Sequence, residues 1–312
     1  MKIGFLFSGQ GSQSVGMGKS FYESSGEVRD LFQKAEETVG IPLTRYLFDG
    51  PEETLTRTDV TQPAICLVSL AALKMATARG LSAAAACGHS LGEYAALVSA
   101  GVISDLDALR VVARRGRAMQ EAAGSNTPGK MAAIVGLGFD AMERALAGLS
   151  GVQIAAQNAP DQIVISGESA GVDAAIEKMK AAGAKNGVVL KTSGAWHSHL
   201  MAPAQPALRE AIAKTEIRAG RFPVIANATA EPFPTDRGPL QDLLVRQLTS
   251  PIRFVECLQR MRAMGVEAFV ELGPGKVLRG LVKKLDRSIP AYAIEDPASL
   301  EDAAKALTAG RV

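Results

Sequence analysis

The chain has 312 residues, of which 47% are hydrophobic and 21% charged, so it can bury the core of one large domain or of two. A formal net charge of +2 argues against a nucleic-acid binder, which normally carries a basic stripe. The cysteines, Cys66, Cys87 and Cys257, are odd in number and lack C-x-x-C spacing. Neither a disulfide framework nor a zinc site is therefore predicted.

No apolar run approaches the length that would span a membrane. Residues 1–7 are too few for a signal peptide and run directly into a glycine loop. These observations favour a cytoplasmic enzyme that is not inserted in a membrane.

Residues 2–7 are predicted to form a first buried strand that ends in the glycine loop of residues 8–13. A glycine loop after a first strand is typical of dinucleotide binding, but Ser14 stands where the third glycine belongs and no helix pattern follows at once. The favoured alternative is a loop whose backbone amides face a site at the strand end, where open α/β sheets bind ligands.

Helical periodicity predicts helices over residues 25–40 and 62–79, the second starting near Pro63. Residues 81–87 are alanine-rich, which favours a helix by propensity alone. Their end is nevertheless predicted to be a buried strand, because the motif that follows requires one.

That motif is Gly88-His-Ser-Leu-Gly92, which fits G-x-S-x-G. The pattern is typical of a nucleophile elbow, where a serine lies on a tight turn between a strand and a helix. Side chains in place of the two glycines would crowd the turn and the helix behind it. Taken alone, the pattern is explained equally well by an ordinary turn before a helix.

Ser104 is predicted to cap a long helix, with Asp107 three residues later. The helix carries several arginines, most of which are expected to form a solvated face. Residues 124–129 have the composition of a linker. Beyond them, strands at 131–137, 152–156, 162–166 and 187–192 and helices at 140–149 and 170–182 give the order β-α-β-β-α-β. That order predicts a small ferredoxin-like domain inserted into a larger one.

The larger domain resumes near Ala195. It is predicted to contain helices at 202–214, 240–248 and 254–264, strands at 223–227 and 266–272, and a last helix at 277–284. Alternating strands and helices predict a mainly parallel sheet covered on both faces. We therefore predict an α/β-hydrolase-like catalytic domain formed by residues 1–127 and 195–312, with residues 128–194 as the ferredoxin-like small domain.

A serine nucleophile needs a base to accept its proton, and the chain has three histidines. His89 precedes the serine in the elbow, where a side chain points away, so a supporting role is favoured. His197 and His199 lie where the inserted domain returns to the larger one. From the residues alone, either of these two could be the base.

Six motifs in order resemble the malonyl-CoA:acyl carrier protein transacylase family of fatty-acid synthesis and its polyketide synthase relatives. They span nearly the whole chain. The motifs are Phe7-Ser-Gly-Gln10-Gly-Ser-Gln13, Thr61-Gln-Pro-Ala, Gly88-His-Ser-Leu-Gly-Glu-Tyr94, Arg115-Gly, Gly194-Ala-Trp-His-Ser198 and Val270-Glu-Leu-Gly-Pro-Gly-Lys276.

The resemblance implies that Ser90 is the nucleophile and that His197, not His199, is its base. The backbone amides of Gln10 and Leu91 would form the oxyanion hole, as expected for the residue after an elbow serine and a donor from a second loop. Arg115 would form a bidentate pair with the free carboxylate of a malonyl group.

The resemblance further implies that the Gln247 backbone carbonyl orients the histidine, so that no third acid is needed, and that Asn158 lines the cleft. Ser8 stands where family members usually have proline, which alters the rigidity of the loop that carries Gln10. Trp196 replaces the usual phenylalanine and, being larger, favours a small acyl group.

The implied reaction is transfer of a malonyl group from a coenzyme A thioester to the phosphopantetheine thiol of acyl carrier protein, through an ester on the serine. No metal or redox cofactor, nucleic acid or membrane is expected, and the chain is expected to be a monomer.

A serine hydrolase of similar architecture is the alternative function, followed by a non-catalytic docking subunit. Acidic carrier proteins would dock on a basic patch around Lys283 and Lys284.

Overall fold

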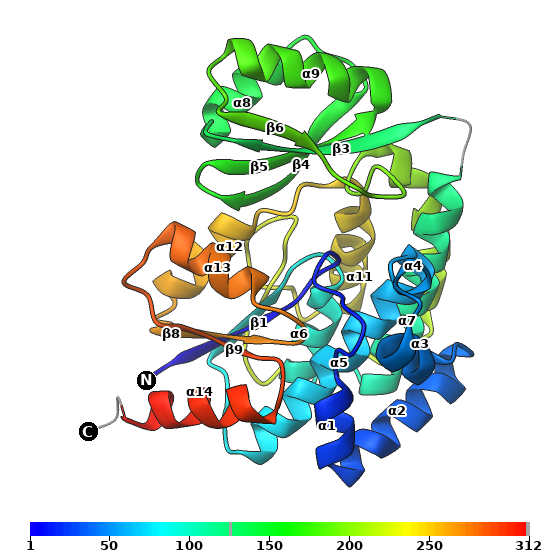
Figure 1. Cartoon of the computed structure of the whole chain (residues 1–312), viewed down its shortest axis with the longest axis vertical. Coiled ribbons are helices and arrows are strands. Elements are labelled where there is room, and N and C mark those ends of the chain that lie inside the picture. The colour runs from blue at the N-terminus through cyan, green and yellow to red at the C-terminus, as the bar shows by residue number, and fades with distance from the viewer. Residues whose placement is uncertain (125–126, 310–312) are drawn as a thin grey trace.

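The computed structural model describes residues 1–124 and 127–309 and shows an α/β protein with two separate sheets (Figure 1). The larger sheet is parallel, in the strand order β7-β2-β1-β8-β9. Its strands are β1 (Ile3–Phe7), β2 (Ala85–Gly88), β7 (Val224–Ile225), β8 (Ala268–Leu272) and β9 (Ala291–Ile294). The predicted mainly parallel sheet is confirmed, although β9 was not predicted.

Helices surround this sheet on both sides (Figure 1). They are α1 (Lys19–Ser24), α2 (Gly26–Val39), α3 (Leu43–Asp49), α4 (Glu52–Leu55), α5 (Thr58–Ala78), α6 (Gly92–Ala100), α7 (Asp105–Ala123), α10 (Gln205–Ala213), α11 (Arg237–Arg246), α12 (Phe254–Ala263), α13 (Val277–Leu285) and α14 (Pro297–Ala309). Short 3-10 helices cover His199–Ala204 and Gln247–Thr249.

Three sequence expectations need correction. Helix α5 begins at Thr58 rather than near Pro63, so Pro63 lies inside the helix, beyond its first turn, where proline removes one backbone hydrogen bond. The helix expected over 202–214 is a 3-10 helix in its first turn. The helix expected to be last, α13, is followed by β9 and α14, which cover the edge of the sheet.

The apolar character of α5 also differs from expectation. This 21-residue helix has a mean hydropathy of 1.4 over an 18-residue window, so by length and composition it could cross a membrane. However, 78% of that window is buried inside the protein, where α5 packs against α7, α6 and α2. A buried core helix passes the same test of composition, and α5 lies in the core.

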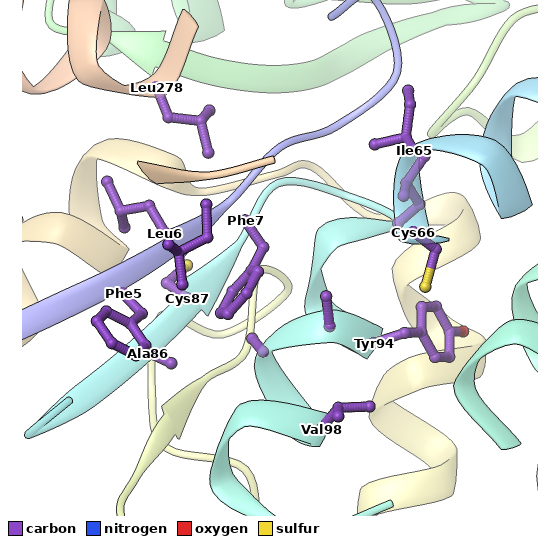
Figure 2. Packing of buried hydrophobic residues seen from close by; sticks show 14 of the residues in the cluster. Phe5, Leu6, Phe7, Ile65, Cys66, Ala86, Cys87, Tyr94, Val98 and Leu278 are labelled. Atoms are coloured by element: carbon purple, nitrogen blue, oxygen red, sulfur yellow. The ribbon is translucent and has the colours of Figure 1, made fainter. Parts of the chain in front are cut away.

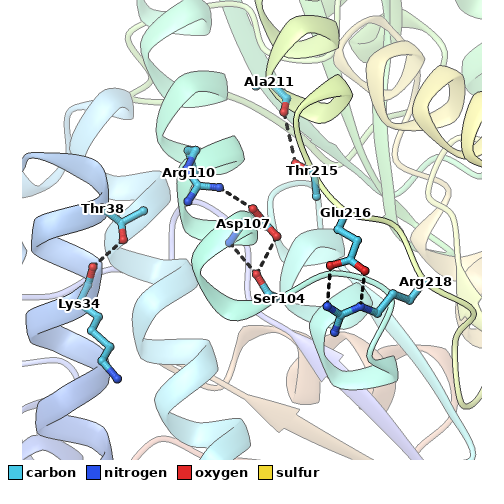
Figure 3. A network of polar contacts seen from close by, with 9 residues as sticks. All are labelled: Lys34, Thr38, Ser104, Asp107, Arg110, Ala211, Thr215, Glu216 and Arg218. Carbon is cyan, nitrogen blue, oxygen red and sulfur yellow. Dashed lines mark hydrogen bonds and ion pairs between the residues drawn. The ribbon is translucent and has the colours of Figure 1, made fainter.

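Helix α7 is capped as its sequence predicts (Figure 3). The Ser104 hydroxyl accepts a hydrogen bond from the Asp107 N–H at 3.1 Å and donates to Oδ2 of Asp107 at 2.8 Å. Such a cap contributes about 1 kcal/mol to helix stability. It sets the start of the helix, and therefore the position of Arg115 three turns later.

The core beneath the elbow is formed by β1, β2 and α6 (Figure 2). Leu6 and Phe7 on β1 are completely buried, and Tyr94 and Val98 on α6 are also buried, with the Tyr94 ring directed toward Cys66 of α5. Burying a large apolar side chain contributes about 1.5–3 kcal/mol. The strand that ends at Gly88 and the helix that begins at Gly92 are thereby held rigidly on either side of Ser90.

The second sheet is antiparallel, in the order β4-β5-β3-β6, and lies at one end of the molecule (Figure 1). Its unit contains β3 (Gly129–Val135), α8 (Phe139–Leu146), β4 (Val152–Ala159), β5 (Gln162–Glu168), α9 (Ser169–Ala181) and β6 (Asn186–Val189). The predicted element order is confirmed, and the unit has its own hydrophobic cluster. Residues 125 and 126 of the predicted linker lie outside the described residues.

Candidate active site

Ser90 lies on a strained turn between β2 and α6, with φ at +53°. A Cβ added at Gly88 would lie 1.9 Å from the carbonyl carbon of Gly92, and one added at Gly92 would lie 2.2 Å from the carbonyl oxygen of Phe7. Because no side chain fits at these distances, both glycines are required by the turn. The steric argument made from the sequence is confirmed.

The Ser90 hydroxyl contacts His197. Its Oγ lies 2.8 Å from Nε2 of His197, and Nδ1 of His197 lies 2.9 Å from the backbone carbonyl oxygen of Gln247. A carbonyl can only accept, so Nδ1 carries the proton and Nε2 is free to accept one from Ser90. Burial, and secondarily the charge of Arg115, lowers the pKa of His197 to about 3, so the imidazole is neutral at physiological pH.

Arg115 is completely buried beside the serine. Nη2 donates to Ser90 Oγ at 3.0 Å and to Oε1 of Gln247 at 2.8 Å, while Nη1 donates to Oε1 of Gln62 at 2.8 Å. Among the described residues, its Nε has no hydrogen-bond partner. These direct partners are neutral, so within residues 1–124 and 127–309 the guanidinium next to the nucleophile has no carboxylate in contact with it.

A cavity of about 510 Å³ opens onto this serine. Both sheets contribute to its walls: Gln10, His89 and Ser90 come from the parallel part, whereas Asn158 and Met131 come from the antiparallel part. Its charged lining residues are Arg57 and Lys191, both cationic. Arg57 is paired with Asp59, so Lys191 is the lining cation that favours a ligand with negative charge.

The amides expected to form an oxyanion hole belong to two different loops. Leu91 follows the serine in the turn, and Gln10 lines the cavity from the loop after β1. Within the described part of the chain, neither backbone N–H donates to an intramolecular acceptor. Ser8, in place of the usual proline, holds this loop by donating to Glu271 and to the Pro274 carbonyl.

Of the two other histidines, His199 lies outside the cavity, whereas His89, whose side chain was expected to point away from the site, lines it. His89 is buried, and its Nε2 lies 2.8 Å from Oδ1 of Asn158, so the two side chains form one wall of the cavity. His199 is about half exposed, with its Nε2 3.5 Å from a carboxylate oxygen of Glu168. Trp196 lines the cavity and is 5% exposed.

Sequence reasoning missed Asn227 and Glu93. Oδ1 of Asn227 accepts the Ser90 N–H at 2.9 Å, and its Nδ2 donates to the Gly88 carbonyl at 2.8 Å, so this side chain clamps the elbow. Glu93 is buried and accepts hydrogen bonds from Asn227 N–H and Gln247 Nε2. Burial raises the pKa of Glu93 to about 8, while these N–H groups and the Arg115 charge favour its ionised form. The only sequence signal was the place of Glu93 in the Gly92-Glu-Tyr94 motif.

In a comparison with known proteins, residues 4–310 match the acyl transferase domain family. The malonyl CoA-acyl carrier protein transacylase of Bacillus subtilis (strain 168) is 42% identical over 310 residues, which cover 98% of this chain and 97% of that protein. The chain belongs to the malonyl-CoA:acyl carrier protein transacylase family. It is an acyltransferase.

Solved structures of transacylases in this family have the same fold as this chain. The malonyl CoA-acyl carrier protein transacylase of Clostridium perfringens superposes with a TM-score of 0.95 at 35% identity, covering 100% of this chain and 98% of that one. A malonyl transacylase in complex with its type II polyketide synthase acyl carrier protein superposes with a TM-score of 0.93 at 36% identity, covering 98% and 100%.

Proposed function

We propose that the chain transfers a malonyl group from malonyl-CoA to the phosphopantetheine thiol of an acyl carrier protein. The observation that carries this proposal is the position of Arg115, a fully buried cation that touches the nucleophile Oγ and only neutral partners. A guanidinium forms two charge-assisted hydrogen bonds to a carboxylate, which an uncharged acyl chain cannot accept. The acyl group that fits this site carries a free acid.

The residues support a two-step reaction through an ester on Ser90. His197 accepts the hydroxyl proton as Oγ attacks the thioester carbonyl, and the N–H groups of Gln10 and Leu91 stabilise the oxyanion. The thiol of coenzyme A leaves with that proton. In the second step His197 accepts the proton of the carrier thiol, whose sulfur attacks the ester carbonyl. The ester bond to Ser90 breaks, and His197 returns the proton to Oγ, which restores the free serine.

A serine hydrolase would use the same elbow with water as the acceptor. Transfer is favoured because the family relatives are transacylases and one neighbour is bound to an acyl carrier protein. The deciding experiment incubates the chain with radiolabelled malonyl-CoA and a panel of holo carrier proteins, and measures malonyl carrier and free malonate. We expect carrier loading far above malonate release. Release at the same rate with and without carrier would contradict the proposal.

His197→Ala is expected to lower kcat for malonyl transfer by about 10²–10⁴-fold, the usual contribution of a general base. His199→Ala is the matched control and should remain close to the parent, because His199 is half exposed and contacts Glu168 rather than Ser90. Steady-state transfer rates of both variants test the assignment. A larger loss in His199→Ala than in His197→Ala would contradict it.

The low pKa of His197 predicts an unusual pH profile. A base works when neutral, so Ser90 reactivity should persist well below pH 6.5 and fall only as the pH approaches the pKa of about 3. The rate of Ser90 modification by a fluorophosphonate measures this without a titrating substrate. Removing the nearby cation in Arg115→Ala should move the acid limb to higher pH. A parent midpoint near 6.5 would contradict the prediction.

The free energy of unfolding is also expected to depend on pH in this acidic range. Between pH 6.5 and about 3 the unfolded chain protonates His197 and the folded chain does not, so stability decreases as the pH falls. Circular dichroism at each pH defines the range in which the protein is folded and the reactivity profile can be interpreted.

We infer finer structural assignments from the topology. The antiparallel order β4-β5-β3-β6, with both α8 and α9 packed together, supports a ferredoxin-like unit spanning about residues 128–194. The strand–serine–helix elbow on a parallel sheet supports an α/β-hydrolase-like domain formed by residues 1–127 and 195–312. We further propose a cytoplasmic monomer that uses no metal or redox cofactor.

In the carrier docking patch that we propose around Lys283 and Lys284, both ammonium groups also make hydrogen bonds within the protein. Lys283 donates to the backbone carbonyls of Arg287 and Ile289, and Lys284 donates to the Gln162 side chain. Lys276 pairs with Glu295. Charge reversal at Lys283 would therefore disturb the turn after α13 as well as any docking.

A further inference from the structure

Glu93 is the only carboxylate that is hydrogen-bonded to the groups around Ser90 among the described residues. It lies in the first turn of α6 and is 1% exposed. Oε1 accepts the backbone N–H of Asn227 at 2.5 Å, and Oε2 accepts Nε2 of Gln247 at 2.6 Å. It does not contact Arg115 directly.

Gln247 connects Glu93 to Arg115. Its Nε2 donates to Glu93 and to the Ser90 carbonyl at 2.9 Å, while its Oε1 accepts from Nη2 of Arg115. An amide has one donating and one accepting end, so these contacts fix its orientation. If the amide turned over, its NH₂ group would face the guanidinium and its oxygen would face the Ser90 carbonyl.

The orientation of Gln247 therefore depends on an acceptor at position 93. Both oxygens of Glu93 face N–H donors, so neither has an acceptor for a proton of its own. These donors and the Arg115 charge therefore favour the carboxylate, against the burial that raises the pKa of Glu93. One of those donors is a backbone N–H, which cannot turn. A side chain at position 93 that donates toward Gln247 would force the amide of Gln247 to turn over.

We propose that Glu93 is a positioning residue that acts through Gln247 on Arg115 and so sets the selectivity for acid acyl groups. Its negative charge balances the buried guanidinium through the neutral amide, without a direct ion pair. A glutamate bonded directly to Arg115 would compete with the substrate carboxylate for the guanidinium N–H groups, whereas a glutamate that acts through the amide does not. This inference rests on the proposed malonyl transfer.

The test compares kcat and KM for malonyl-CoA and acetyl-CoA in the parent and in Glu93→Gln. The glutamine keeps its oxygen toward the fixed Asn227 N–H and directs its NH₂ group at Gln247. We expect kcat/KM for malonyl-CoA to fall on the order of 10²-fold, the scale of a misplaced substrate contact. The value of kcat/KM for acetyl-CoA should change much less, because an acetyl group makes no bond to Arg115.

Glu271→Gln is the control for loss of a buried carboxylate charge, since Glu271 is buried and accepts the N–H groups of Leu278 and Arg279 and the Ser8 hydroxyl. The loop that carries Ser8 serves both acyl groups alike. Glu271→Gln should lower stability without changing the ratio of malonyl to acetyl transfer. In an Arg115→Ala background, Glu93→Gln should have no further effect on that ratio. An unchanged ratio in Glu93→Gln, or additive effects in the double variant, would overturn the proposal.

Gln247→Met keeps the inference testable if Glu93→Gln does not fold. It removes the connecting amide and retains the backbone carbonyl that contacts His197. Selectivity should fall as in Glu93→Gln, and a ratio equal to that of the parent would again overturn the proposal. Failure of the proposed function is a different result, because the parent itself would then form no malonyl ester.

Discussion

Ser90→Ala is expected to abolish formation of the malonyl ester and to lower malonyl transfer by about 10⁶-fold, the scale for removing a serine nucleophile. Ser90 is the hydroxyl that contacts both the neutral His197 imidazole and the Arg115 guanidinium. Alanine differs from serine only by the hydroxyl, so the variant should keep the strained turn and fold. Intact-mass measurement after incubation with malonyl-CoA should show an adduct on the parent alone.

Ser193→Ala is the control for this experiment. Ser193 lines the same cavity, but its hydroxyl lies near Thr58 and Gln120 rather than a histidine. This variant should form the adduct as the parent does. An adduct of the same mass on Ser90→Ala would place the acyl group on another residue and remove the assignment of Ser90 as the nucleophile.

Arg115→Ala is expected to remove the preference for malonyl over acetyl groups. The variant loses the bond to the malonyl carboxylate, and it also loses the cost of burying an unpaired cation when acetyl-CoA occupies the site. Malonyl transfer should fall by about 3–5 kcal/mol in kcat/KM, the scale for losing one partner of a buried ion pair. Acetyl transfer should hold steady or rise.

Arg115→Lys separates charge from geometry. A lysine retains the positive charge but cannot form the two parallel bonds of a guanidinium, so it should restore malonyl transfer only in part. Transfer from malonyl-CoA and acetyl-CoA is measured across the parent and both variants. If both donors declined together in Arg115→Ala, the arginine would be structural, as its bonds to Gln62 and Gln247 would then suggest.

Several regions were predictable because their patterns are local. Gly88 and Gly92 are required because any side chain there would clash with nearby backbone, so the G-x-S-x-G pattern by itself predicts the shape of the turn. The capping pair Ser104 and Asp107 is likewise separated by three residues. The six ordered motifs singled out Ser90, His197 and Arg115 through resemblance, and the structure brings these three side chains together.

The chain by itself therefore determined the alternation of strands and helices, the tight turn at Ser90 and the small antiparallel unit, because hydrophobic period and turn chemistry act between near neighbours. Only the tertiary structure decided how the serine is held. Gln247 bonds to the Ser90 carbonyl across 157 positions and to Glu93 across 154, and no local pattern encodes pairs so far apart. Their orientation depends on where the first turn of α6 meets the 3-10 helix that carries Gln247, and the amide then turns to satisfy its buried neighbours.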